Sequence, residues 1–237
     1  MRYLVLAIFL GSSSPCAAQP LQMLTEEYPP FSFREGSELR GISVDQVKAI
    51  MQAANLQYSL EMQPWARAFS LTETTPDTCV FTTGMLPERL ARFKWVQPLV
   101  LDTMVLVRKT GSQIDAKTLD DAKAFSIGVH KDDSAETYAR QQGFPHLDIA
   151  PSLDLSLRKL VSGRVDLMIM ARTTYQNLRN QGQPIEPILN LDGTRAGIAC
   201  NLDVPDTEIS AMQHALDILI SSGGQADIYR KYGQETN

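Results

Sequence analysis

The sequence has few cysteines and histidines, and those few are scattered along the chain. Of 237 residues, 3 are cysteine and 3 are histidine, and they do not stand at the short spacings that bind zinc or another metal. The motifs of serine hydrolases, of zinc proteases and of phosphate-binding glycine loops are missing too. We therefore expect no metal, no cofactor and no catalytic residues.

Blocks of like charge are also absent. The chain has 22 Lys and Arg against 27 Asp and Glu, a formal net charge of −5. Without a basic stretch, a general affinity for nucleic acid is not expected. Apolar residues make up 43% and charged residues 21%, as in ordinary soluble globular proteins. The length fits one large domain or two small ones.

The hydrophobic run at the N-terminus is too short to span a membrane. It covers residues 3–10, after a basic start at Arg2, whereas a spanning helix needs about 20 apolar residues. Small residues at Cys16 and Ala18 follow. We predict that residues 1–18 are a secretory signal peptide, cleaved before Gln19, and that no membrane segment is retained. A buried N-terminal strand or a lipid attached to Cys16 are the alternatives.

Two cysteines remain after such a cleavage, Cys79 and Cys200. Export leads to an oxidising compartment, where an even pair of cysteines is most simply explained by a disulfide bond. We therefore predict one disulfide between these two residues.

Strand and helix patterns alternate along the rest of the chain. Ser43 is predicted to cap a helix with apolar residues on one face, and Ser152 to cap another. Apolar strands are expected over residues 100–107 and 195–201. Such alternation predicts an α/β fold with parallel strands flanked by helices. Three or four strand and helix pairs in each half favour two similar lobes.

Six short segments follow one another in a family's characteristic order. They are EYPPF at 27–31, GISVD at 41–45, GMLPERLARFKWVQP at 84–98, FSIGV at 125–129, GRVD at 163–166 and DIYRKY at 227–232. The segment at 84–98 resembles the pattern T-x-x-R-x-x-x-F-x-F-S-x-P-Y. Together the segments resemble the family 3 extracellular solute-binding proteins, which are the amino-acid receptors of ABC importers. The likeness covers nearly all of the chain after residue 18.

This resemblance implies the fold of a type II periplasmic binding protein. Two α/β lobes with mostly parallel sheets are joined by a two-strand hinge, and they close on a ligand in the cleft between them. By position, lobe one would comprise residues 19–99 and 197–237, lobe two residues 104–193, and the hinge crossings residues 100–103 and 194–196. Both Cys79 and Cys200 then fall in lobe one, which supports the disulfide.

The resemblance also implies ligand-binding residues in the first lobe. Arg89 matches the family's carboxylate-binding arginine, whose planar guanidinium takes a carboxylate through two parallel hydrogen bonds. Trp65 and Tyr28 match aromatic residues of the cleft, with Trp65 stacking on the ligand. Arg67 is either a ligand contact or an ordinary exposed arginine. Free hydroxyl and N–H groups at the end of a strand add Thr82, Thr83 and Gly84.

In the second lobe, the turn between a strand and a helix is predicted to contact the ligand through His130, Asp133 and Ser134. Relatives have small residues in this turn, and the N–H groups that begin the helix face a carboxylate there. In this sequence Asp132 and Asp133 bring negative charge instead. This negative charge disfavours the binding of an anion by the turn.

A larger departure is Ala171, which follows the predicted contact residue Met170. Relatives place an aspartate at this position to receive the ammonium group of the ligand. Two alternatives follow: the solute lacks an ammonium there, so that ordinary amino acids bind weakly, or another acid takes the ammonium. The candidates for that acid are Glu26, Glu27 and Asp133.

These observations predict a periplasmic receptor that acts as a monomer, binds a small carboxylate-bearing solute and serves an ABC transporter permease. One alternative is an enzyme on the same fold, similar to the dehydratases, with His130, Glu27 or Asp133 as acid or base. A second alternative is a receptor that signals to a membrane sensor. The fold alone does not decide between these functions.

Overall fold

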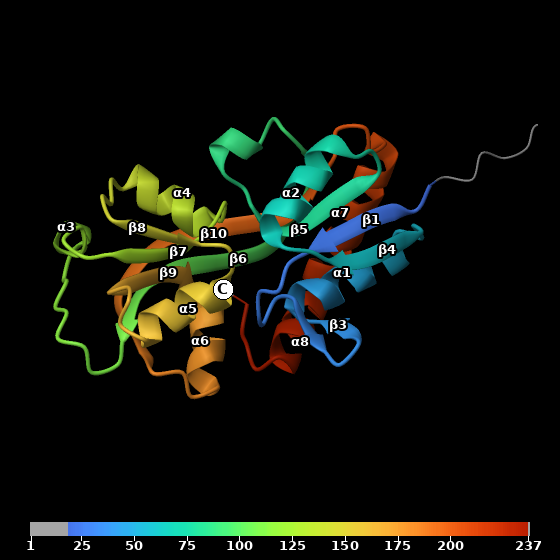
Figure 1. The fold of residues 1–237 in the computed structure, drawn as a ribbon. Helices are drawn as coiled ribbons and strands as arrows, with labels where there is room; N and C mark the ends of the chain where they lie inside the picture. Colours follow the sequence, from blue (N-terminus) through green and yellow to red (C-terminus); the bar gives the residue numbers. More distant parts are fainter. Residues whose placement is uncertain (1–18, 237) are drawn as a thin grey trace, which may run out of the picture.

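The protein contains one large mixed sheet. The computed structural model describes residues 19–236, so the predicted signal peptide lies outside the described residues. Eight strands follow the order β4-β1-β5-β10-β6-β9-β7-β8, with a separate hairpin of β2 and β3 (Figure 1). The strands are β1 Leu21–Thr25, β2 Phe33–Glu35, β3 Glu38–Arg40, β4 Tyr58–Met62, β5 Thr78–Gly84, β6 Lys94–Lys109, β7 Ile127–His130, β8 Leu147–Ala150, β9 Leu167–Ala171 and β10 Ile185–Cys200.

Helices cover the sheet at both ends. They are α1 Ile42–Ala53, α2 Trp65–Thr74, α3 Leu119–Ala122, α4 Ser134–Gln141, α5 Leu153–Val161, α6 Arg172–Asn180, α7 Asp206–Ser221 and α8 Gly224–Lys231, with a short 3-10 helix at Pro87–Arg89. Within residues 19–236, none of them is both long enough and apolar enough to cross a bilayer.

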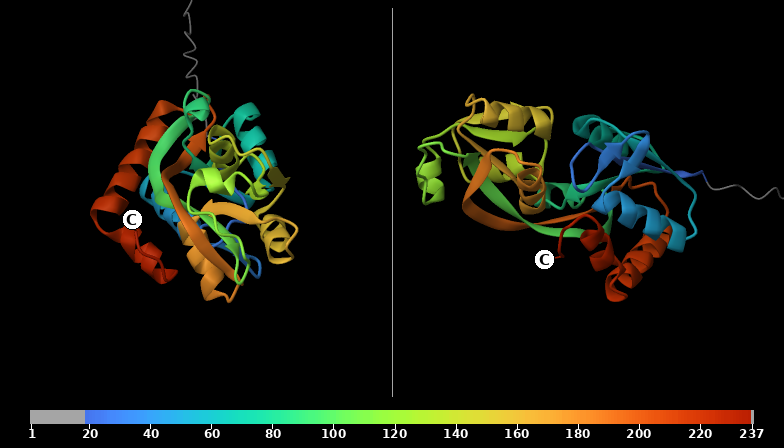
Figure 2. Two further views of the ribbon diagram at one scale, coloured as in Figure 1. Left: turned by 90° about the vertical axis from the view of Figure 1, so that its left-hand side faces the viewer. Right: turned by 90° about the horizontal axis from the view of Figure 1, so that it is seen from below.

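The elements form two lobes, which Figure 2 shows side by side in its right-hand view. We define the first lobe as β1, β4 and β5 with α1, α2, α7 and α8, and the second lobe as β7, β8 and β9 with α3 to α6. Neighbouring strands are parallel within each group of three. The long antiparallel strands β6 and β10 run from one lobe to the other. This confirms the predicted α/β architecture, while the residue boundaries of the lobes stay a prediction.

The two crossing strands are much longer than the sequence predicts. The strands expected at 100–107 and 195–201 are parts of β6 and β10, which have 16 residues each. Proline at position 98 interrupts the apolar pattern of β6. The pairing of β10 with β6 shifts register at three places, so the alternation of apolar and polar residues breaks there. The hairpin of β2 and β3 and strand β8 were not predicted either.

Helix α1 begins without the cap that the sequence predicts. Its N-cap is Gly41, and Ser43 lies buried within the first turn, so the capping role given to Ser43 was wrong. The N–H groups of Ile42 and Ser43 instead donate to the carbonyl oxygens of Pro30 and Phe31, each at 2.9 Å. Because these main-chain acceptors satisfy the helix start, no side-chain cap is needed. They also fix the loop after β1 against α1.

The predicted disulfide is confirmed. Cys79 in β5 and Cys200 in β10 are register partners on neighbouring antiparallel strands, with Cα atoms 4.0 Å apart. Both side chains are fully buried. The bond therefore ties a strand of the first lobe to one of the two crossing strands.

Candidate ligand-binding site

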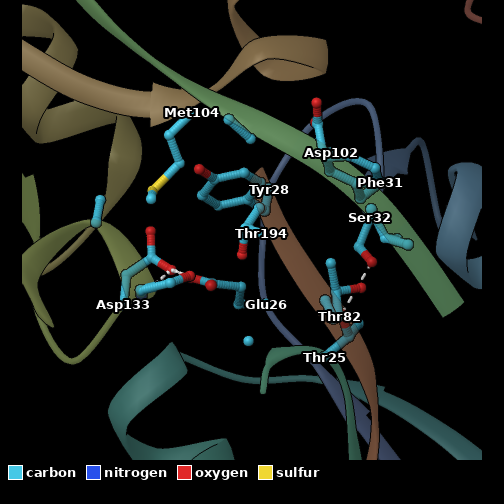
Figure 3. Close-up of a pocket in the computed structure, with 16 residues that line it drawn as sticks. Thr25, Glu26, Tyr28, Phe31, Ser32, Thr82, Asp102, Met104, Asp133 and Thr194 are labelled. Atoms are coloured by element: carbon cyan, nitrogen blue, oxygen red, sulfur yellow. Dashed lines mark hydrogen bonds between the residues drawn. The ribbon is translucent and has the colours of Figure 1, made fainter. Parts of the chain in front are cut away.

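A cavity lies between the two lobes, beside the crossing strands. The first lobe contributes the end of β1, the following loop and the end of β5, and the second lobe contributes the start of α4 and the end of β9. Figure 3 shows these side chains converging from both lobes. The lining residues are Thr25, Glu26, Tyr28, Phe31, Ser32, Thr82, Gly84, Val100, Asp102, Met104, Asp133, Ser134, Ala135, Ala171, Thr194 and Ala196.

Five residues predicted from the sequence line this cavity: Tyr28, Thr82, Gly84, Asp133 and Ser134. Gly84 and Ser134 are opposite each other across the boundary between the lobes. A Cβ atom at position 84 would lie 2.8 Å from Ser134 Oγ, closer than real contacts allow. The absence of a side chain at Gly84 therefore lets the end of β5 lie against the start of α4.

The other predicted residues lie outside the lining. The Thr83 hydroxyl is buried and donates to the Val80 carbonyl oxygen at 3.1 Å. Met170 belongs to the hydrophobic core, and Arg67 is exposed. His130 is buried next to a residue of the lining. Trp65 and Arg89 form a contact between the lobes.

That contact centres on the main-chain carbonyl oxygen of Asp132. The indole Nε1 of Trp65 and the guanidinium Nη2 of Arg89 both donate to this oxygen, each at 2.7 Å. Trp65 begins α2 and Arg89 ends the 3-10 helix, so both donors belong to the first lobe side of the cleft. Asp132 precedes α4 in the second lobe. Two hydrogen bonds on one carbonyl oxygen thus hold the lobes together.

Arg89 is a buried cation that lies next to Gly84 but outside the cavity lining. It is 6% exposed, and its Nη1 donates to the Gly84 carbonyl oxygen at 3.3 Å. Its guanidinium lies over the Phe69 ring, 4.9 Å from the centroid. Burial lowers the pKa of Arg89, while the negative charge of Asp133 acts in the opposite direction. Among residues 19–236, no carboxylate lies within 4.0 Å of this guanidinium.

The turn before α4 is held by its own acids. Asp132 has a φ of 58°, the left-handed region that aspartate tolerates better than most residues. Its N–H donates to Glu136 Oε2 at 2.7 Å, and Glu136 pairs with Arg140. The Asp133 carboxylate caps α4 by accepting from the Ser134 N–H at 2.6 Å. One oxygen of Asp133 is therefore engaged by the helix start.

The sequence of this chain also matches a known family. The sequence pattern of the bacterial extracellular solute-binding proteins, family 3, matches residues 21–235. The chain belongs to this family. Residues 84–98, one of the six segments of the resemblance, include Gly84 of the cavity lining and Arg89 next to it.

Individual relatives of this solute-binding protein agree with that assignment. The L-cystine-binding protein TcyJ of Escherichia coli K12 is 26% identical over 157 residues, which are 64% of this chain but only 58% of TcyJ. The solved structure of ArtJ, an arginine-, lysine-, histidine-binding protein of Geobacillus stearothermophilus, matches with a TM-score of 0.82 and 22% identity, covering 92% of this chain and 97% of ArtJ. A histidine kinase sensor domain with similarity to periplasmic binding proteins matches with a TM-score of 0.83 and 18% identity, covering 90% and 96%.

At 22% and 18% identity, the likeness to these two solved structures shows a shared fold and does not show a shared ligand or role. The fold of this solute-binding protein is that of the type II periplasmic binding proteins. The predicted family and fold are therefore confirmed.

Several residues of the lining were not predicted as contacts. Asp102, Met104 and Thr194 come from the crossing strands β6 and β10, whose full length the sequence did not indicate. The Asp102 carboxylate accepts hydrogen bonds from the N–H groups of Thr103 at 2.7 Å and Thr173 at 3.1 Å. It therefore serves the start of α6. Burial raises the pKa of Asp102, and the hydrogen bonds from Thr173 and Thr103 act in the opposite direction.

Glu26 is the most strongly perturbed acid of the lining. Burial raises its pKa well above the ordinary value, and the negative charge of Asp133 raises it further. The same two causes, burial first and then Asp133, raise the pKa of the Tyr28 hydroxyl. The buried His130 ring stacks on Tyr28, with centroids 6.4 Å apart. Charge in this part of the solute-binding protein is thus poorly solvated.

Glu26→Gln is expected to stabilise the ligand-free protein at neutral pH. A carboxyl whose pKa is raised on folding holds its proton more tightly in the folded state, so its contribution to stability falls as pH rises above the ordinary glutamate value. The variant removes this penalty, and its advantage disappears below that pH, where Glu26 is protonated in both states. Because about 1 kcal/mol moves Tm by roughly 2 to 4 °C in a chain of this size, a gain of a few degrees is expected.

Thermal unfolding of ligand-free wild type and variant from pH 4 to pH 8 measures this difference. Glu27→Gln is the matched control, since Glu27 is the exposed neighbour and its loss removes the same charge. A Glu26→Gln variant less stable than wild type at pH 7, or a gain equal to that of Glu27→Gln, would contradict the interpretation of Glu26 as a destabilising buried acid.

Proposed function

We propose that this solute-binding protein is a periplasmic receptor that encloses a small carboxylate-bearing solute between its lobes. The observation that carries the proposal is a cavity whose walls come from both lobes, with a buried guanidinium next to Gly84 of its lining. Small-molecule sites are typically concave and combine apolar walls with a few polar groups, and they often lie between domains. Closure on a solute is the expected motion of two lobes joined by two strands.

The carboxylate is proposed because of the surroundings of Arg89. A buried guanidinium that bonds only to neutral carbonyl oxygens and faces aromatic rings has lost hydration without gaining an ion pair. A solute carboxylate near Gly84 would supply the missing charge through a bidentate pair. The names of TcyJ and ArtJ describe amino-acid receptors, and every amino acid has a carboxylate. Both facts support a solute of this class.

We propose further that the receptor delivers its solute to the permease of an ABC importer and does so as a monomer. Membership of the extracellular solute-binding family supports the export that this role requires. Uptake of radiolabelled solute by cells with and without the gene tests the role. Loss of uptake in the deletion strain is expected, and unchanged uptake would leave the signalling role as the better explanation.

Native mass spectrometry of the protein, purified without unfolding, tests the binding function. We expect a fraction of the protein to have an additional mass of one small molecule, which is released on mild denaturation. The released molecule should contain a carboxylate. A co-purified molecule without one would leave the receptor function intact and remove the role proposed for Arg89.

The receptor is proposed to release its solute unchanged. An enzyme on this fold would need an acid or a base beside the bound solute. The observation that favours an enzyme is the pair of His130 and Glu26, whose Nε2 and Oε2 atoms are 3.5 Å apart. Incubation of the protein with the released molecule, followed by mass spectrometry, separates the two functions. Recovery of the same mass is expected, whereas a new product would establish an enzyme.

A further inference from the structure

Two titratable side chains, Glu26 and His130, meet across the boundary between the lobes. Glu26 follows β1 in the first lobe, and His130 ends β7 in the second. The His130 Nε2 atom lies 3.5 Å from Glu26 Oε2. The rings of Tyr28 and His130, which also come from different lobes, stack with their centroids 6.4 Å apart. Closure of the lobes therefore brings this pair together, and opening separates it.

Both members of the pair are largely withdrawn from water. The His130 side chain is 2% exposed and the Glu26 side chain 15%. Among the residues that the structure describes, neither ring nitrogen of His130 has a hydrogen-bond partner, although buried polar groups nearly always have one. A neutral ring could donate one N–H to Glu26, but the negative charge of the carboxylate would remain. A proton on either side chain removes that charge from the pair.

The surroundings of the pair are negative. Asp133 extends toward Glu26 from the second lobe (Figure 3). Burial raises the pKa of Glu26, and the charge of Asp133 raises it further. The described lining of the cavity contains neither lysine nor arginine. The nearby titratable groups are Tyr28, on which the charges of Glu26, Asp102 and Asp133 act, and Arg89, on which the charge of Asp133 acts. An ionised Glu26 is thus a second negative charge in a poorly solvated place.

Charges on the other neighbouring elements are exposed or already paired. Lys131 and Asp132, which follow His130 in the chain, are exposed. Helix α5 packs on β7, and the ion pairs on α5 and α4 are Arg158 with Asp154, Lys159 with Asp148, and Arg140 with Glu136. Within residues 19–236, no group of three or more His, Cys, Asp or Glu is arranged to hold a metal ion. We therefore consider a proton as the neutralising cation.

We propose that closure of the lobes takes up one proton from solvent, and that Glu26 and His130 hold this proton between them. With the proton on either side chain, as a neutral carboxyl or as an imidazolium, the pair has no net charge. Without it, Glu26 keeps a charge that burial and Asp133 both disfavour. This inference rests on the proposed function, because closure encloses the solute, and it adds that the receptor closes more readily at low pH than at high pH.

The pH range follows from the open form, in which both groups meet water. A solvated carboxyl and a solvated imidazole lose their protons near about pH 4.3 and pH 6.5. Above about pH 6.5 the open pair therefore has no proton, and each further pH unit weakens closure by up to roughly 10-fold. Below that pH the imidazole of the open pair already has the proton, so the dependence disappears. It also disappears at high pH, once the closed pair has lost its proton.

Calorimetry counts the proton. The small molecule that co-purifies with the protein is titrated at pH 7.5 in phosphate and in Tris, two buffers that differ strongly in their heat of ionisation. The difference in binding heat gives the number of protons taken up. We expect wild type to take up about one proton more than Glu26→Gln, whose amide has no charge to neutralise. Wild-type affinity should fall by roughly 10-fold or more from pH 6.5 to pH 8, and that of Glu26→Gln should stay nearly constant.

His130→Gln distinguishes a shared proton from protonation of Glu26 alone. The new amide can donate to the Glu26 carboxylate without a proton from solvent, so proton uptake should fall to less than half. Glu27→Gln and His146→Gln are matched controls with exposed side chains, and they should take up protons like wild type. Because the same molecule is titrated throughout, its own protonation cancels between variants. Thermal unfolding without ligand shows that each variant is folded.

Fluorescence of Trp65 follows closure without any solute. Trp65 is 4% exposed and donates to the Asp132 carbonyl oxygen of the opposite lobe, so opening exposes its ring to water. Trp65 and Trp95 are the two tryptophans of the sequence, and Trp95→Phe leaves Trp65 alone. We expect its emission to shift to longer wavelength as pH rises from 6 to 8.5. The shift should disappear when Glu26→Gln is added.

Two calorimetric results would overturn the inference while the receptor function stands. One is equal proton uptake in wild type and Glu26→Gln, and the other is undiminished uptake in His130→Gln. If no molecule co-purifies, the proposed function fails, and the fluorescence of Trp65 decides the inference separately. An emission that does not change with pH, or that changes equally with Glu26→Gln, overturns it.

Discussion

Arg89→Ala is expected to weaken the binding of a carboxylate-bearing solute by roughly 30-fold or more. Removing one partner of a buried, hydrogen-bonded ion pair typically costs about 2 to 5 kcal/mol, because the remaining charge stays buried and unpaired. Arg89 is 6% exposed and lies next to Gly84 of the cavity lining. Arg89→Lys keeps the charge but loses the planar pair of donors, so it should recover only part of the affinity.

Three classes of compound that share one side chain, namely an amino acid, its keto acid and its amine, separate the two roles that Arg89 can have. If it binds the carboxylate, the variant weakens the amino acids and keto acids far more than the amines. If it acts only through its hydrogen bond to the Asp132 carbonyl oxygen, all three classes weaken equally. Arg92→Ala is the control, since Arg92 is half exposed and pairs with Glu73. Calorimetry showing unchanged affinity in Arg89→Ala would remove the carboxylate assignment.

Loss of the disulfide is expected to destabilise the protein by about 3 to 5 kcal/mol. The bond closes a loop with a sequence separation of 121 residues, and in the chain-entropy model a loop of this length restricts the unfolded chain strongly. The double variant Cys79→Ser with Cys200→Ser should therefore lose roughly 6 to 20 °C in Tm. Solute affinity measured well below this Tm should change little, because both cysteines lie outside the cavity lining.

A reductant on the wild-type protein gives the same test without a new side chain. Thermal unfolding with reductant should match that of the double variant. Thiol titration of the denatured, unreduced protein that begins at Gln19 should find no free thiol. Two reactive thiols, or a Tm that reductant leaves unchanged, would contradict the structure.

The sequence predicted the parts of the fold and site that depend on local residues. Turn residues at the ends of strands and before helices, such as Thr82, Gly84 and Ser134, lie at the cavity because strands of parallel sheets end at a common edge. The disulfide followed from the number of cysteines and the expected compartment. The crossing strands could not be given their length, because register shifts in β10 hide the alternation on which a strand prediction depends.

The contacts between the lobes could not be predicted from the sequence, for a different reason. Trp65 and Arg89 bond to a main-chain oxygen of Asp132, and a carbonyl oxygen exists at every residue, so no pattern marks it. Nor does the pattern distinguish Glu26 from Glu27. Only the path of the chain after β1 places Glu26 in the cavity lining and leaves Glu27 exposed.

Enclosure of the solute between the lobes is the central claim, and one calorimetric titration tests it most directly. The small molecule that co-purifies with the protein is titrated into wild type, Gly84→Val and Gly193→Val. A side chain at position 84 meets Ser134 of the opposite lobe, with its Cβ 2.8 Å from Oγ, whereas at position 193 the nearest atom is 3.6 Å away, an ordinary contact. Because overpacking costs about 1 to 3 kcal/mol, Gly84→Val should bind roughly 10-fold to 100-fold more weakly. Gly193→Val should bind like wild type. Wild-type affinity in a folded Gly84→Val variant would show that the solute does not bind between closed lobes.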